Sequence, residues 1–344
     1  MTEEKEQTIP ISPRDLAQKI GKLTHGERLK AILQLFKKED RVLIVIIADP
    51  DSMACALALK RLLSRRVEEI CIAHPNEITR VNNLAMRNRL HISLQRLNVI
   101  KKERYTKFVL LDSQPLHSPE LSDFHYDAVI DHHPMTEGWH AGFVDIRPEY
   151  GATASMMTEY LKAAKIKPSV ILATALFYGI KVDTQNFAKK AIYPDILAFQ
   201  YLFQLINQNL LNRIENADIR HSELKYIKSA FQGLIVSQDR VYAHVDNAPN
   251  TDILVVIADF LSHIHDISWV IVSGIYEDKL VVIFRSDGYR KNAGKMAKKI
   301  FGEMGSAGGH RQSARAEIPI KNLSKIRIDK FKTSSLKRLI LKHM

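Results

Sequence analysis

The stretch VLIVIIADPDSMACALALKRLL, residues 42–63, indicates the fold class of this chain. Its first six residues are an unbroken run of aliphatic side chains, which is typical of a strand buried on both faces of a parallel sheet. Residues 52–63 have the composition of a helix, with Ser52 near its expected start. The acidic segment 48–51, ADPD, separates the two elements. A strand, a short turn and a helix in this order predict one unit of an α/β sheet.

Apolar runs and helical patterns alternate along the rest of the first half. The further expected strands cover residues 69–73, 108–111 and 127–130. The expected helices cover residues 13–38 (one or two helices), 77–97, 151–164 and 169–180. Because strands alternate with helices, we expect a doubly wound α/β domain with a parallel sheet.

The pattern changes in the second half. Residues 194–235 have the pattern of long helices that connect two domains. The strands expected beyond them are 240–245, 269–276 and 280–284, with a helix at 252–264, which together predict a smaller α+β unit. The expected division is an N-terminal helical segment (1–40), an α/β domain (41–205), a helical linker (206–236), an α+β domain (237–320) and a basic tail (321–344), with a cleft between the two domains.

The chain is strongly basic, and the excess is concentrated at its end. The formal net charge is +12 over 344 residues. Against the acidic Asp329, residues 321–344 contain the cations Lys321, Lys325, Arg327, Lys330, Lys332, Lys337, Arg338 and Lys342. A basic balance favours polyanionic partners such as nucleic acid, although a solubilising tail would have the same composition.

Other features concern the setting of the protein. No apolar stretch approaches the roughly 18 residues of a membrane span. The N-terminal sequence MTEEKEQTIPISP lacks the apolar core of a secretory signal. Cys55 and Cys71 lie in apolar surroundings and form no C-x-x-C pair, as expected of small core residues in a reduced protein. We therefore expect a cytoplasmic protein without a membrane partner.

Acidic residues follow several of the apolar segments. Asp49 and Asp51 follow the first expected strand, Asp112 follows the third, residues 131–133 (Asp-His-His) follow the fourth, and Asp183 follows an apolar segment further along. Ligands of open α/β sheets bind outside the carboxyl ends of the strands. Each residue alone is commonly a helix cap or a turn former. Together they predict one site at that edge of the sheet.

Carboxylates with imidazoles and no thiolates suit Mn²⁺ or Mg²⁺ better than a structural zinc ion. Two such ions would share a bridging carboxylate and lower the pKa of a bound water to about 7. Residues 151–153 (Gly-Ala-Thr), ahead of an expected helix, either cap that helix or supply N–H groups to an anion.

The ordered set of acidic and histidine residues resembles the DHH phosphoesterase superfamily. The second half strengthens the resemblance. Residues 281–287, VVIFRSD, and 305–310, GSAGGH, resemble the Arg-Ser strand and the glycine-rich loop of the DHHA1 substrate-binding domain. The resemblance covers about residues 40–320. It implies a DHH catalytic domain followed by a DHHA1 domain, with Mn²⁺ as the cofactor and Mg²⁺ as the alternative.

The resemblance also assigns residues to roles. The implied metal ligands are Asp49, Asp51, Asp112, His132 and Asp183. Asp112 would bridge two ions, and the implied catalytic residues are His133, close to the substrate phosphate, and Asp131. The implied substrate-binding residues are Arg285, Ser286, Gly308, Gly309 and His310. Glycines let a backbone approach an oxyanion, and an arginine can pair with two phosphate oxygens.

One position departs from the family pattern. Members of the most similar subgroup usually carry a histidine four residues before the first aspartate, where this chain has Val45. In the alternative register, with residues 50–51 opening the motif, Ile47 would occupy the histidine position and Met53 that of the second aspartate. Either register removes an imidazole, so we expect one tight and one weak metal position.

The subgroup consists of proteins that degrade nanoRNA and dephosphorylate 3′-phosphoadenosine 5′-phosphate. We therefore expect a metal-dependent phosphoesterase that hydrolyses short single-stranded oligonucleotides, RNA or DNA, or 3′,5′-bisphosphonucleotides. Two alternatives stay open. A degenerate member would bind nucleotide or RNA without hydrolysis, and an exopolyphosphatase would need no base recognition. The sequence is also compatible with a homodimer.

Overall fold

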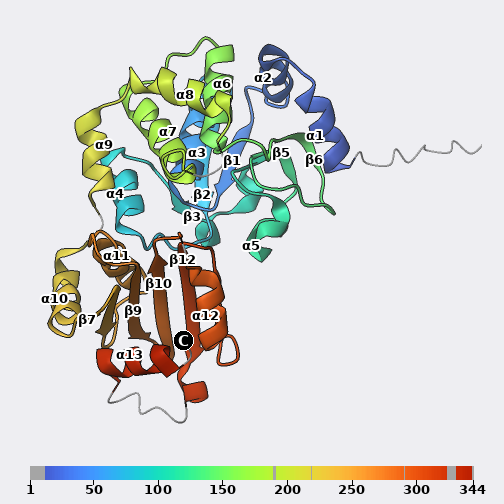
Figure 1. Ribbon diagram of the computed structural model, residues 1–344. Coiled ribbons are helices and arrows are strands. Elements are labelled where there is room, and N and C mark those ends of the chain that lie inside the picture. The colour runs from blue at the N-terminus through green and yellow to red at the C-terminus, as the bar shows by residue number, and fades with distance from the viewer. Residues whose placement is uncertain (1–11, 189–190, 218, 290, 324–330, 343–344) are drawn as a thin grey trace, which may run out of the picture. The chain divides into compact units, whose positions relative to one another are not determined.

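The structure is a computed structural model that describes residues 12–188, 191–217, 219–289, 291–323 and 331–342. The chain divides into two compact units, Met1–Asn216 and Ala217–Met344 (Figure 1). The division falls inside the segment 206–236 expected as a linker, and the finer five-part division stays a prediction. Residues 1–11 of the expected N-terminal segment lie outside the described residues.

The first unit is built on a six-stranded parallel sheet with the order β3-β2-β1-β4-β5-β6. Its strands are β1 (Arg41–Ile46), β2 (Glu69–His74), β3 (Gln95–Arg96), β4 (Lys107–Leu111), β5 (Tyr126–Asp131) and β6 (Ala141–Ile146). The strand order reverses direction between β1 and β4, where open sheets of this kind bind ligands. The predicted doubly wound α/β class is confirmed.

Helices pack on both faces of this sheet (Figure 1). The helices of this unit are α1 (Pro13–Gly21), α2 (His25–Leu33), α3 (Pro50–Leu63), α4 (Val81–Arg89), α5 (Pro119–Ser122), α6 (Thr153–Ala163), α7 (Val170–Asp183), α8 (Tyr193–Phe203) and α9 (Gln208–Glu215), with short 3₁₀ turns at Leu97–Val99, Lys102–Arg104 and Pro115–His117. Ile44 and Ile46 of β1 face a core shared with α3, α6 and α7, whereas Leu43 and Val45 face a second core on the opposite side. This alternation follows from the two-residue period of a strand.

Several local predictions about the first unit were wrong. Residues 77–97 are helical only within α4, and residues 95–96 form β3. β6 is absent from the predicted strands because Gly142 and Asp145 interrupt its apolar pattern. The segment 194–235 forms separate helices, of which α8 packs on α6 and α7 within the first unit. By contrast, the helix expected at residues 169–180 forms as α7, which ends at Asp183.

The second unit has a mixed six-stranded sheet with the order β11-β12-β10-β9-β8-β7. Its strands are β7 (Ile235–Ser237), β8 (Arg240–Val245), β9 (Trp269–Tyr276), β10 (Lys279–Ser286), β11 (Ser306–Gly309) and β12 (Ser313–Pro319). Its helices are α10 (Leu224–Gln232), α11 (Asp252–Leu261), α12 (Ala293–Phe301) and α13 (Thr333–Lys342), with 3₁₀ turns at His221–Glu223 and Ile320–Leu323. The predicted smaller α+β unit is confirmed.

Two segments of the second unit differ from expectation. The glycine-rich segment 305–310 is not only a loop, because residues 306–309 form β11 and pair with β12. The segment 321–344, expected as a tail, contains α13, whose Leu336 and Ile340 are buried in the core of the unit. Residues 324–330 and 343–344 of that segment lie outside the described residues. None of the helices in the described ranges is long and apolar enough to cross a membrane.

Candidate metal centre

Four side chains converge at the carboxyl edge of the parallel sheet. Asp51, Asp112, His132 and Asp183 each offer one ligand atom, and these atoms lie within 4.8 Å of one another. Asp51 lies in the first turn of α3 after β1, Asp112 follows β4, and His132 follows β5. Because β1, β4 and β5 are neighbours in the sheet, their ends bring these three residues together, and α7 adds Asp183.

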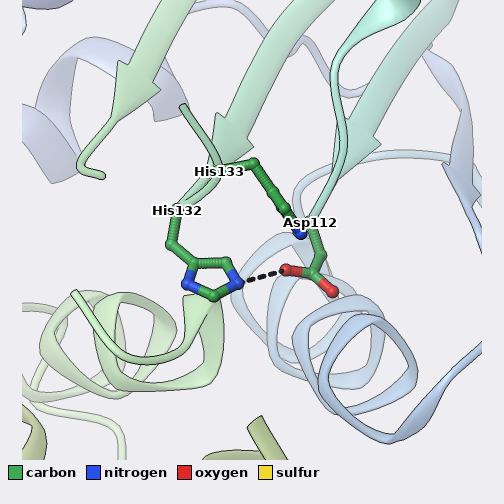
Figure 2. A group of neighbouring side chains, drawn as sticks. All are labelled: Asp112, His132 and His133. Atoms are coloured by element: carbon green, nitrogen blue, oxygen red, sulfur yellow. Dashed lines mark ion pairs between the residues drawn. The ribbon is translucent and has the colours of Figure 1, made fainter. Parts of the chain in front are cut away.

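The orientation of His132 indicates a cation at this place. Its Nδ1 lies 3.2 Å from the carbonyl oxygen of Tyr150, which only accepts hydrogen bonds, so Nδ1 carries the proton. Its Nε2 lies 3.6 Å from Oδ1 of Asp112 and 3.2 Å from Oδ2 of Asp183 (Figure 2 draws the first of these pairs). This buried nitrogen has no hydrogen-bond partner among the described residues. A lone pair that faces two carboxylates is favourable only when a proton or a metal ion lies between them.

The pKa values of the cluster are shifted by burial and by the charges of its own members. Burial and the nearby charge of Asp183 raise the pKa of Asp51 to about 7. Burial and the charges of Asp51 and Asp49 raise the pKa of Asp112 well above its usual range. Burial alone would lower the pKa of His132, but its interactions with Asp183 and Asp51 raise it to about 9. A divalent cation at the centre would reverse these shifts and favour the charged carboxylates.

Asp51 is fixed by the N-terminus of α6. The N–H groups of Thr153 and Ala154 donate to its two carboxylate oxygens at 2.7 and 2.8 Å. The hydroxyl of Thr153 donates to Oδ1 of Asp112 at 2.7 Å. Residues 151–153 were expected either to cap this helix or to supply N–H groups to an anion, and the N–H of Thr153 binds a carboxylate of the chain itself. The positive end of the helix dipole stabilises that carboxylate.

Backbone geometry and close packing limit which residues fit at this centre. Asp112 has a φ of 57°, a left-handed conformation that is uncommon for a non-glycine residue and often occurs at functional sites. Gly179 of α7 lies against α3, and a Cβ at this position would lie 3.1 Å from both Cα and Oδ1 of Asp51. Glycine at this position lets α7 approach the metal-binding carboxylate, a role that the sequence analysis does not identify.

Asp49 lies beside the cluster and not in it. It caps α3, because its Oδ1 accepts the N–H of Ser52 at 2.9 Å. Burial and the charge of Asp183 raise its pKa. Among the described residues, Asp49 belongs to no group of ligand atoms within 4.8 Å, and neither does His74, whose Nδ1 lies 2.7 Å from the carbonyl oxygen of Asn76.

Val45 faces the second core and is fully buried. It pairs with Ala73 of β2 and Leu110 of β4, and the residues packed around it are apolar. A histidine here would bury an imidazole within this apolar cluster, which is unfavourable.

Asp131 orients the second histidine of the motif. Oδ1 of Asp131 lies 2.8 Å from Nδ1 of His133, and Oδ2 accepts the side-chain N–H of Gln114 at 2.7 Å. Burial would raise the pKa of Asp131, but the bond to His133 lowers it, and the same bond raises the pKa of His133. The side chain of His133 is 44% exposed, so its remaining nitrogen can reach a ligand. His117 forms a second group with Asp131 and His133. Neither Gln114 nor His117 is identified by the sequence analysis.

The candidate substrate-binding residues of the second unit have partners of their own. Nε of Arg285 donates to Oδ1 of Asp259 at 2.6 Å, and the hydroxyl of Ser286 donates to the carbonyl oxygen of Arg311 at 2.9 Å. The N–H of His310 donates to the carbonyl oxygen of residue 313 at 2.7 Å.

The two glycines ahead of His310 differ in their surroundings. Gly309 has a φ of 145°, and a Cβ there would lie 2.5 Å from Cα of Ala314, so the turn between β11 and β12 requires glycine. A Cβ on Gly308 would meet no atom within 4 Å. The turn itself therefore requires glycine at position 309, independently of any ligand.

Comparisons with known proteins support the resemblance. Residues 41–180 match the model of the DHH family, N-terminal domain. The chain is 34% identical over 312 residues to the uncharacterized protein MJ1633 of Methanocaldococcus jannaschii, a match that covers 89% of this chain and 64% of the relative. The chain thus spans less than two thirds of the length of the curated relative it matches. An exopolyphosphatase-related protein from Bacteroides fragilis has the same fold, with a TM-score of 0.64, 14% identity, and coverage of 91% of this chain and 95% of that one.

Proposed function

We propose, from the premise that residues 41–180 form a DHH family N-terminal domain, that this protein is a metal-dependent phosphoesterase. Its substrates would be short single-stranded oligonucleotides or 3′,5′-bisphosphonucleotides. The observation that carries the proposal is the convergence of Asp51, Asp112, His132 and Asp183 at the switch point of the sheet. Three carboxylates and one imidazole match the ligand preference of Mn²⁺ or Mg²⁺.

The four converging residues would hold the tighter ion. When bound, a divalent ion would polarise a phosphoryl oxygen and lower the pKa of a water molecule, so that the deprotonated water can attack phosphorus. Asp112 would contribute to both metal positions. The second position would rely on Asp49 and Asp112, and it would be weak because Val45, at the position of the family histidine, supplies no imidazole and faces the second core. This asymmetry is supported by the place of Asp49 outside the group of four.

His133 would contact the substrate phosphate, and Asp131 would act as a positioning residue. Because Asp131 holds Nδ1 of His133, the ring presents Nε2 to a ligand in one orientation. The bond also favours the protonated imidazole, which can donate a charge-assisted hydrogen bond to a phosphoryl oxygen.

The resemblance assigns substrate binding to residues of the second unit. Arg285, Ser286, Gly308, Gly309 and His310 keep this role in the proposal. Arg285 is paired with Asp259, so substrate phosphate would compete with this carboxylate for the guanidinium.

Three substrates and one variant test the proposal. Turnover of a short oligoribonucleotide, a 3′,5′-bisphosphonucleotide and inorganic polyphosphate should be compared in chelator and in Mn²⁺. We expect Mn²⁺-dependent hydrolysis of one or both nucleotide substrates, and none by a folded Asp112→Ala protein. Binding of the oligonucleotide without turnover of any substrate would refute the proposal in favour of a non-hydrolysing relative. A strong preference for polyphosphate would refute it in favour of an exopolyphosphatase.

A further inference from the structure

Helices α12 and α13 lie on the same face of the second sheet. Ala297 and Ile300 of α12 and Leu336 and Ile340 of α13 are buried in one apolar core with β8, β9 and β10. Met296 and Ile340 line one small cavity, so the two helices are neighbours. Helices α10 and α11 pack against the opposite face, in a separate core. The face with α12 and α13 therefore has its own outer surface.

That outer surface is basic. Lys295, Lys298 and Lys299 project from α12 at spacings of three and four residues, which places them on one side of the helix. Lys332 precedes α13, and Lys337 and Arg338 lie on it. These six residues are called the basic face below. Neither helix contains an acidic residue, and within the described ranges none of the six forms an ion pair.

We propose that the basic face binds the phosphate backbone of a nucleic acid. Unpaired cations over two adjacent helices are complementary to a chain of phosphates, which carry one negative charge each. The aromatic residue of α12, Phe301, is buried, and α13 has none, so bases find no stacking surface on these helices. Binding is therefore independent of sequence and depends strongly on salt.

The same observations argue against a lipid surface as the partner. A helix that binds a membrane inserts its apolar side into the lipid. The apolar sides of α12 and α13 are already buried against the sheet, and of their large aliphatic residues Leu341 is the one that is clearly exposed. The remaining surface offers charge without an apolar anchor.

Paired substitutions on opposite faces of the sheet provide a matched test. The test variant is Lys298→Gln/Lys299→Gln, and the control is Lys225→Gln/Lys228→Gln on α10. Both variants remove two charges from exposed helical positions of the same unit, so the net charge of the two proteins is equal. Binding of a long mixed-sequence single-stranded oligonucleotide is measured in chelator, which separates it from any metal-dependent hydrolysis.

We expect the test variant to weaken binding about 25-fold at about 0.1 M salt if affinities are equal near 1 M salt, because each lost phosphate contact on a single strand is worth roughly 0.7 in the slope of log affinity against log salt. The slope itself should fall by about 1.4. The control should match the natural protein, and Lys337→Gln/Arg338→Gln should resemble the test variant. Equal losses in the test and control variants would overturn the proposal, as would an unchanged affinity in either basic-face variant. Tight binding to phosphatidylglycerol vesicles that the test variant abolishes would assign the face to membranes and refute it.

Discussion

Removing the metal should make the stability of this protein depend on pH in a defined direction. The pKa of Asp51 in the folded protein is about 7, against an ordinary value of 3.8, because of burial and the charge of Asp183. A carboxyl group with a raised pKa in the folded state stabilises the fold at low pH. That contribution is lost as the pH rises from about 4 through 7. His132, whose pKa is raised to about 9, acts with the same sign over a higher range.

The magnitude follows from the shift of the fully buried Asp51. A difference of about three pKa units, at about 1.4 kcal/mol for each unit, corresponds to about 4 kcal/mol of unfolding free energy. Urea unfolding in chelator should therefore show a large loss of stability between pH 4 and pH 8. Added Mn²⁺ should stabilise the fold more at pH 8 than at pH 5, because at the lower pH the ion must displace the protons of the cluster.

A variant separates this effect from other titrations. Buried His74 and His244 have lowered pKa values, so their contribution to the unfolding free energy changes with pH in the opposite direction. The pH dependence of the natural protein is therefore compared with that of a variant of the cluster. Asp112→Asn removes one charge of the cluster, and its amide can still bond to the hydroxyl of Thr153. This variant should lose less stability at high pH in chelator and gain none from Mn²⁺. Glu137→Gln, which removes an exposed ion pair, is the control and should behave as the natural protein. The reasoning fails if Asp112→Asn keeps both the pH dependence and the stabilisation by Mn²⁺.

Three further substitutions have defined outcomes. Gly179→Ala should weaken Mn²⁺ binding, measured by calorimetry, because the added Cβ would displace Asp51. Gly26→Ala, where a Cβ would meet no atom within 4 Å, is the control and should leave the Mn²⁺ affinity unchanged. Equal Mn²⁺ affinities of the two variants would contradict the role of Gly179. Arg285→Ala should raise KM roughly tenfold to a hundredfold, as expected for a lost charge-assisted phosphate contact, without changing Mn²⁺ affinity. A loss of bound metal would disprove that separation of roles. Val45→His should lower the unfolding free energy by several kcal/mol, because the side chain is enclosed by apolar residues. A variant of unchanged stability that binds two Mn²⁺ ions equally tightly would show that the strand end admits the imidazole.

The sequence by itself determined those features that depend on local patterns. The run at residues 42–47 predicts β1 because a strand buried on both faces needs continuous apolar side chains. Asp49 and Asp51 come directly after this run in the sequence, so they are predicted at the end of β1. Asp112 and His132 are placed in the same way after the apolar runs of later strands. The alternation of strands and helices then predicts the parallel sheet. Elements with weak local patterns, such as β6, β11 and α13, could not be found in this way, since their side chains are buried by partners distant in sequence.

Only the tertiary structure decided which of these residues meet. Asp51 is held by the N–H of Thr153, which lies 102 positions away, and Asp183 reaches the cluster from the end of a helix. Gly179 has a role only because α7 packs directly on α3. Val45 turns away into the second core because side chains alternate along a strand. Periodicity in sequence records the surroundings of one element at a time. The order of the strands and the packing of the helices set the distances between elements, and the metal centre depends on those distances.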